Sequence, residues 1–119
     1  MIIGTTRAVR VFAFPSAVDL RKGYDGLYGL VQTGLGRDPL SGELFLFVNQ
    51  GRKLCKVLLW DGTGLCLMAK RLEQGGFRWP GIQGGVMRLS AAQLGALLEG
   101  LDWRRVHGGR RAQAPQLAG

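Results

Sequence analysis

The sequence has few of the residues that proteins most often use for metal binding and covalent chemistry. Its 119 residues include two cysteines, Cys55 and Cys66, and one histidine, His107. The cysteines form no Cys-x-x-Cys unit and lie in strand-like apolar runs, so we expect both to be reduced residues in or near the core and exclude zinc and thioredoxin-type chemistry. A single histidine also provides no histidine metal cluster, and its place in an aperiodic tail argues against a general base.

Long apolar runs and nucleotide-binding motifs are also missing. No stretch approaches the roughly 20 apolar residues of a membrane span. The start, MIIGTTRAVR, lacks the basic segment and apolar core of a secretory signal. The sequence therefore predicts a cytoplasmic protein without a membrane partner. Neither a phosphate-binding loop nor a dinucleotide fingerprint occurs, and we expect no cofactor.

Acidic residues are scarce compared with basic ones. Sixteen Lys and Arg face eight Asp and Glu, which gives a formal net charge of +8 at pH 7. Such an excess favours a polyanionic partner, with nucleic acid as the leading candidate. Solubility or an acidic protein partner is the alternative explanation of the same charge.

The spacing of apolar residues predicts one α+β domain over residues 1–102. We expect an antiparallel sheet of about four or five strands in a meander, with two helices packed on it. The first helix follows Leu20, and the second follows Ser90, which forms a Ser-x-x-Gln capping box with Gln93. Residues 103–119 are basic and aperiodic and predict a flexible C-terminal arm. Strands are expected at 8–14, 44–48, 53–60 and 65–72, and Val86–Ser90 is expected to lead into the second helix.

The carboxylates provide no convincing catalytic group. Asp61-Gly62-Thr63-Gly64 looks like an aspartic-protease motif, but those enzymes need two copies of Asp-Thr-Gly, and a hairpin turn explains it better. A metal-dependent nuclease would need several converging carboxylates. The candidates Asp19, Asp25, Asp61 and Glu73 occupy cap, helix or turn positions, which leaves Asp102 alone. We therefore predict no catalytic and no metal-binding residue.

Basic residues are the better candidates for function, as contacts to nucleic-acid phosphates. A solvated surface is the alternative for each residue taken singly. Lys70 and Arg71 should point to opposite faces of a strand, which weakens a model with one flat patch. Phe77 and Trp79 could form a stacking platform, but alternating aromatic residues more often belong to a core. The selected phosphate-binding candidates are Arg21, Lys22, Lys70, Arg71, Arg78, Arg104 and Arg105, and Arg52, Lys53 and Lys56 lie around the first hairpin.

Four segments together resemble a known family. They are DLRKGYDGLYGLV (19–31), DPLSGELFLFVN (38–49), KVLLWDGTGLCLMAKRLEQGGFRWP (56–80) and LSAAQLGALLEGLDW (89–103). In order and spacing they are similar to the TnpB-type accessory protein of the IS-66 group of bacterial insertion sequences. The resemblance implies a small protein that is encoded beside a separate transposase, assists movement of the element and has no established catalytic residues.

Two functional hypotheses follow. In the first, the protein is a non-enzymatic accessory factor that binds DNA within a transposase complex. In the second, it is an adaptor that contacts the transposase and leaves DNA to it, and the continuous apolar run Leu44–Val48 then suggests that the sheet face opposite the helices is covered by a partner or by another copy in a homodimer. A nuclease is a third and much weaker hypothesis.

Overall fold

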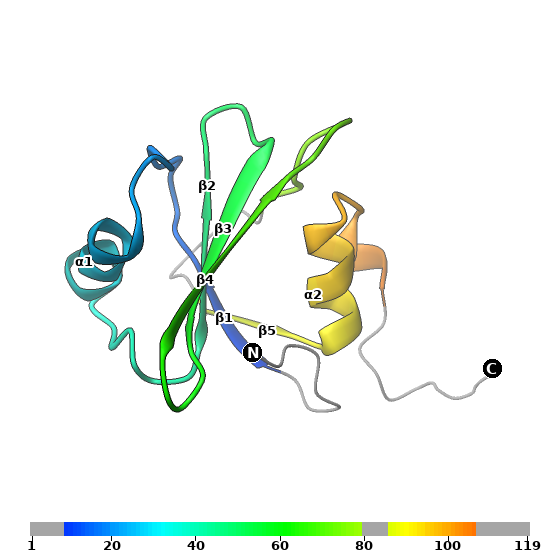
Figure 1. Ribbon diagram of the computed structural model, residues 1–119. Helices are drawn as coiled ribbons and strands as arrows, with labels where there is room; N and C mark the ends of the chain where they lie inside the picture. Colours follow the sequence, from blue (N-terminus) through cyan, green and yellow to red (C-terminus); the bar gives the residue numbers. More distant parts are fainter. Residues whose placement is uncertain (1–8, 80–85, 107–119) are drawn as a thin grey trace.

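A computed structural model describes residues 9–79 and 86–106 and shows a sheet between two helices (Figure 1). The five strands lie in the order β4-β3-β2-β1-β5. The strands are β1 (Val9–Ala13), β2 (Leu44–Val48), β3 (Leu54–Trp60), β4 (Leu65–Arg71) and β5 (Val86–Leu89). The helices are α1 (Tyr24–Gly34), α2 (Ala91–Leu98) and the short 3-10 helix η1 (Trp103–Arg105).

The α+β class is confirmed, but the sheet is mixed rather than antiparallel throughout. Strands β2, β3 and β4 form the expected meander. Strand β1 runs parallel to β2, because α1 carries the chain back before β2 begins, as a parallel pair requires. Residues Val86–Leu89, expected to lead into a helix, instead pair with β1 as an antiparallel strand.

Strand β2 supplies both cores of the molecule. Leu44, Leu46 and Val48 lie in the core on the α2 side, whereas Phe45 and Phe47 lie in the core on the α1 side. Figure 1 shows the two helices on opposite faces of the sheet. The all-apolar sequence of β2 is therefore explained within one chain. The adaptor hypothesis assumed that both helices cover one face of the sheet and that a partner or another copy covers the opposite face. This assumption is wrong.

The first helix begins later than its apolar spacing suggests. Its N-cap is Gly23, with no side-chain hydrogen bond to the helix. Asp19, expected as a possible cap, instead accepts hydrogen bonds from the backbone and side chain of Arg21. Leu20 is buried in the α1-side core without being helical. The segment before α1 is thus a packed connection at the end of the sheet.

The second helix has the predicted capping box. Ser90 Oγ accepts a hydrogen bond from the Gln93 backbone N–H at 3.1 Å, and Gln93 Oε1 accepts one from the Ser90 N–H at 3.0 Å. Gln93 Nε2 also donates to the carbonyl of Val106, and Trp103 packs against the α2-side core. The described fold therefore continues past residue 102. The rest of the proposed arm, residues 107–119 with His107, lies outside the described residues.

Replacement of Ser90 by alanine is expected to lower the free energy of unfolding by about 1 kcal/mol, because the first turn of α2 loses its side-chain acceptor. Urea unfolding followed by circular dichroism measures the change. Ser90→Thr is the matched control, since it keeps the hydroxyl. Equal stability of the alanine variant and the wild type would contradict a stabilising role for the capping box.

Candidate nucleic-acid interface

The C-terminal ends of β1 and β2, together with the β2–β3 turn at residues 49–53, form one end of the sheet, which we call the hairpin end. Two other segments are tied to it. The N–H of Val18 donates to the carbonyl of Val48, which attaches the segment after β1. The N–H of Phe77 donates to the carbonyl of Arg52 at 2.7 Å, which attaches the segment after β4. Three distant stretches of sequence therefore meet here, at the top of the molecule in Figure 1.

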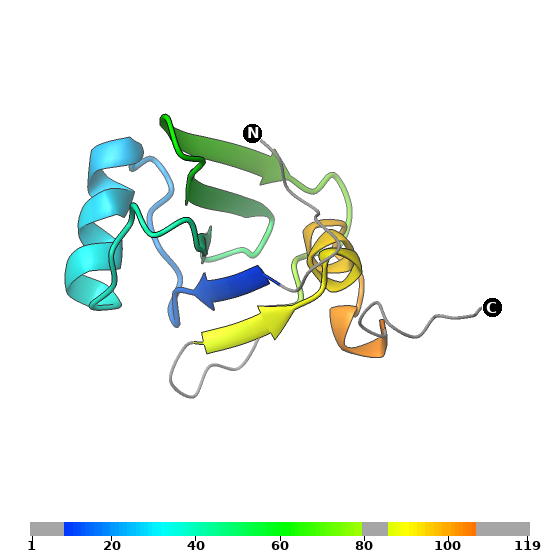
Figure 2. The same ribbon diagram turned by 90° about the horizontal axis from the view of Figure 1, so that it is seen from below.

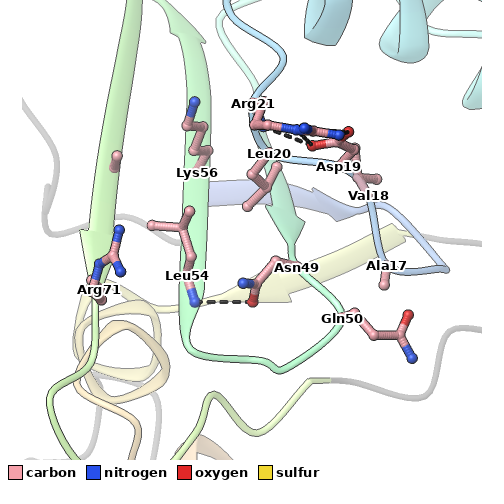
Figure 3. Close-up of a pocket in the computed structure, with 11 residues that line it drawn as sticks. Ala17, Val18, Asp19, Leu20, Arg21, Asn49, Gln50, Leu54, Lys56 and Arg71 are labelled. Atoms are coloured by element: carbon pink, nitrogen blue, oxygen red, sulfur yellow. Dashed lines mark hydrogen bonds and ion pairs between the residues drawn. The ribbon is translucent and has the colours of Figure 1, made fainter.

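An open groove of about 750 Å³ lies at the hairpin end, on the α1 side of the sheet (Figure 3). One wall is the connection between β1 and α1, and the other is formed by β3, β4 and the β2–β3 turn. The groove therefore combines apolar surface with three cations and one acid. Its lining consists of Ala17, Val18, Asp19, Leu20, Arg21, Asn49, Gln50, Leu54, Lys56, Ala69 and Arg71.

The cations of the groove differ in how far their charge is compensated. Arg21 donates from Nε and Nη2 to the Asp19 carboxylate at 2.6 to 3.1 Å, and this holds the pKa of Asp19 well below its usual range. Lys56 Nζ donates to the neutral carbonyl of Lys22 at 3.1 Å. Arg71 is exposed and has no ion pair within residues 9–79 and 86–106. The groove thus keeps two uncompensated positive charges, from Lys56 and Arg71.

The β2–β3 turn adds a further cation at the hairpin end. Arg52 has φ 59°, and it is the one non-glycine residue with positive φ in the described ranges. Glycine or asparagine adopts this conformation at lower cost. Asn49 Oδ1 fixes the turn by accepting hydrogen bonds from the N–H groups of Lys53 and Leu54. The exposed Arg52 side chain therefore projects from a well-defined turn.

The opposite end of the sheet carries two arginines that share one carboxylate. Arg10 and Arg37 both pair with Glu43, at 3.0 and 3.4 Å, and the Glu43 side chain is only 13% exposed. The guanidinium of Arg37 also lies 4.2 Å from the ring centre of Phe12. Through Glu43, which precedes β2, these arginines connect the start of β2 to β1 and to the segment after α1. Among the side chains that the structure describes, the cations without an acidic partner therefore lie toward the hairpin end.

The seven predicted phosphate contacts do not lie on one face. Lys70 and Arg71 point to opposite sides of the sheet, as their alternation predicts: Arg71 lines the groove, and Lys70 pairs with Glu99, just after α2, at 3.0 Å. Arg78 is exposed at the hairpin end. Arg21, Lys22 and Arg71 lie at or beside the groove, whereas Lys70, Arg104 and Arg105 are ion-paired on the α2 side, the last two with Asp102.

One groove residue, Lys56, was not among the seven. Its sequence context shows that it shares a strand face with Leu54 and Leu58, but not what lies across from it. The structure pairs Lys56 with Ala69 and Leu54 with Arg71. A small alanine between two cations leaves the groove open. The position of Lys56 in the groove therefore depends on the register of β3 on β4, which the sequence alone does not give.

The aromatic and acidic candidates have structural roles. Phe77 and Trp79 are 3% and 8% exposed in the α2-side core, so they form no surface for stacking bases. Asp61 Oδ1 accepts hydrogen bonds from the N–H groups of Thr63 and Gly64, both at 3.0 Å, and Gly62 has φ 105°. The Asp61 motif is a β-hairpin turn, as predicted.

Comparison with known proteins identifies a family for this chain. A family model described as "IS66 Orf2 like protein" matches residues 9–108. The chain belongs to this IS66 Orf2-like family. This confirms the resemblance carried by the four sequence segments. No helix among the described residues is long and apolar enough to cross a membrane.

Two relatives from Sinorhizobium fredii extend the comparison. "Uncharacterized protein y4hO" is 45% identical over 96 residues, which are 81% of this chain and 84% of that protein. "Uncharacterized protein y4jC" is 36% identical over 105 residues, which are 88% and 90% of the two chains. No solved structure matches the chain.

The hydrogen bonds of the Asp61 turn predict how the stability of the protein depends on pH. The N–H groups of Thr63 and Gly64 lower the pKa of Asp61 from 3.8 to about 2. Because the folded-state pKa is depressed, the stabilisation is present above about pH 3.8 and is lost as the pH falls toward 2. Urea midpoints of the wild type and Asp61→Asn, whose amide oxygen accepts the same bonds without titrating, should therefore converge or cross in that window. A pH-independent difference between the two proteins would contradict the assignment.

Proposed function

We propose that this protein is a non-enzymatic accessory factor for transposition of an insertion sequence, and that it binds DNA through the cations of the hairpin end within a complex that includes the transposase. The supporting observation is the groove in which Lys56 and Arg71 carry uncompensated charge. Lys22 lies beside it, and Arg52 is carried by the β2–β3 turn at the same end of the sheet. The family supports the link to transposition, and the cations support DNA as the ligand.

The proposed contacts are with the phosphate backbone. Arg71 presents a planar guanidinium that can bind two phosphate oxygens, and Lys56 supplies a point charge on the neighbouring strand. Both side chains are carried by the β3–β4 ladder, which fixes their spacing. Arg21 and Asp19 largely neutralise each other, so Arg21 contributes less. Binding of this kind depends on charge more than on base sequence.

The roles of the carboxylates support a protein without bond-breaking activity. Asp61 is occupied by its own turn, and Asp19 by Arg21. Asp102 accepts a hydrogen bond from the Arg104 N–H and pairs with Arg105, whereas Glu43 binds arginines at the far end of the sheet. Each of these acids therefore has a structural partner.

Arg71→Gln is expected to weaken binding to duplex DNA and to reduce the slope of log K against log salt concentration by about 0.9, because one phosphate contact is lost. Lys70→Gln is the matched control. It removes the same charge one residue away, on the other face, and should leave affinity and slope nearly unchanged. Fluorescence anisotropy with duplexes from an element end and of random sequence, between about 50 and 200 mM salt, measures both quantities.

Two results would contradict DNA binding through the groove. One is the absence of wild-type binding to either duplex at about 50 mM salt, where phosphate contacts are strongest. The other is an equal loss of affinity in the Lys70 and Arg71 variants. Equal loss would mean that only the net charge matters.

A second candidate function, an adaptor for the transposase without direct DNA contact, is favoured by the ion pairs. Among the seven predicted cations, Arg21, Lys70, Arg104 and Arg105 are paired with acids. An adaptor should copurify with the transposase from nuclease-treated extract and show no DNA binding of its own. Failure to associate under these conditions would count against it.

A further inference from the structure

Strand β4 forms one outer edge of the sheet (Figure 2). Hydrogen bonds at its two ends, from Leu72 N–H to the Lys53 carbonyl and from Asp61 N–H to the Gly64 carbonyl, show that the even-numbered residues of β4 bond to β3. Its odd-numbered residues therefore direct their N–H and carbonyl groups away from the sheet. Within residues 9–79 and 86–106 these groups have no backbone partner. The outward residues are Leu65, Leu67, Ala69 and Arg71.

This edge lacks the features that usually prevent pairing with another strand. Proteins protect such edges with central charges, prolines, bulges or very short strands. Residues Leu65–Ala69 are all apolar, and β4 pairs with β3 over seven residues in continuous register without a bulge. Leu67 and Met68 remain partly exposed, and Ala69 is exposed. The first charge is Lys70, near the end of the strand.

We propose that a second copy of this chain pairs with β4 in antiparallel orientation, with the two-fold axis at Met68. In this register Leu67 lies opposite Ala69 of the second copy, and Leu65 opposite Arg71 of the second copy. All outward N–H and carbonyl groups of both strands then find partners, because the paired residues are the odd-numbered ones. The two sheets become one continuous sheet.

The charge pattern of β4 selects a second copy in this orientation. Parallel self-pairing would place Lys70 and Arg71 beside the same residues of the other copy, and facing like charges destabilise a sheet. Antiparallel pairing moves these cations to opposite ends. Each Arg71 then lies beside Leu65 of the other copy, toward the hairpin turn that carries the exposed carboxylate of Asp61. The strand is thus complementary to itself in shape and charge.

The pairing has a consequence for the proposed DNA contacts. A two-fold axis normal to the sheet keeps the α1 sides of both copies on one face, so the two grooves open in the same direction. Six residues separate the paired positions of the two Arg71 side chains along the strand, which is about 20 Å. This arrangement for DNA rests on the proposed function. The pairing of β4 does not, and its tests contain no DNA.

The first test is the mass of Ala69→Pro in solution. Since the Ala69 N–H points away from β3, proline there removes no bond of the β3–β4 ladder but blocks the outer edge. Sedimentation equilibrium should give twice the 12.9 kDa chain mass for the wild type and for Ala69→Ser, and the single mass for Ala69→Pro with its circular dichroism unchanged. A folded Ala69→Pro dimer, or a wild type that is monomeric at about 100 μM, would overturn the proposal.

A cross-link tests the register and does not depend on the proline variant. Met68→Cys in a Cys66→Ser background places two thiols at the two-fold axis, where Cα atoms of a non-hydrogen-bonded pair lie about 4.5 Å apart, within reach of a disulfide. Mild oxidation should link most of this variant into covalent dimers. Ala92→Cys in the same background, exposed on α2, should cross-link only by random collision. Equal yields from the two positions would overturn the register.

Discussion

The burial of β2 on both faces is the constraint from which the rest of this structure follows. Its five apolar residues alternate between two cores, so each face of the sheet needs a cover. Burial of a Leu, Val or Phe side chain contributes about 1.5 to 3 kcal/mol, which makes this strand a large part of the stability of a chain of this size. One helix on each side meets the requirement. The parallel entry of β1 follows, because α1 must cross one face before β2 begins.

The same constraint creates the groove. Helix α1 packs over the middle of the sheet, with Leu27 and Val31 in one core with side chains of β1, β2 and β3, including Phe45, Phe47 and Leu58. It does not reach the hairpin end of β3 and β4, where polar and small side chains replace large apolar ones. The lysine and arginine there remain in contact with solvent. The basic surface is therefore the part of the α1 side of the sheet that this one short helix leaves uncovered.

Local sequence patterns predicted the elements whose signals are local. The run Leu44–Val48, the Asp61 turn and the Ser90 capping box depend on neighbouring residues, and all three are present. Strand β5 was missed because four residues carry little periodic signal, and their pairing with β1 is set by tertiary structure. The start of α1 was placed too early, because Leu20 is buried by the connection and not by a helix. Within the candidate site, strand alternation placed Lys70 and Arg71 on opposite faces of the sheet. The acids that neutralise Lys70 and Arg105 are Glu99, which is distant in sequence, and Asp102, which lies in the connection after α2. These two pairings became visible only in the fold.

The position of β1 has a consequence for how the chain is made. Strand β1 lies between β2 and β5, and Val9 of β1 pairs with Leu89 of β5. During synthesis β1 therefore keeps one row of backbone groups unsatisfied until the chain as far as Leu89 has left the ribosome. Contacts of such long sequence separation form slowly. Nascent chains that stop before β5 would expose that row to other unfinished molecules, so the emergence of β5 protects this protein from misassembly.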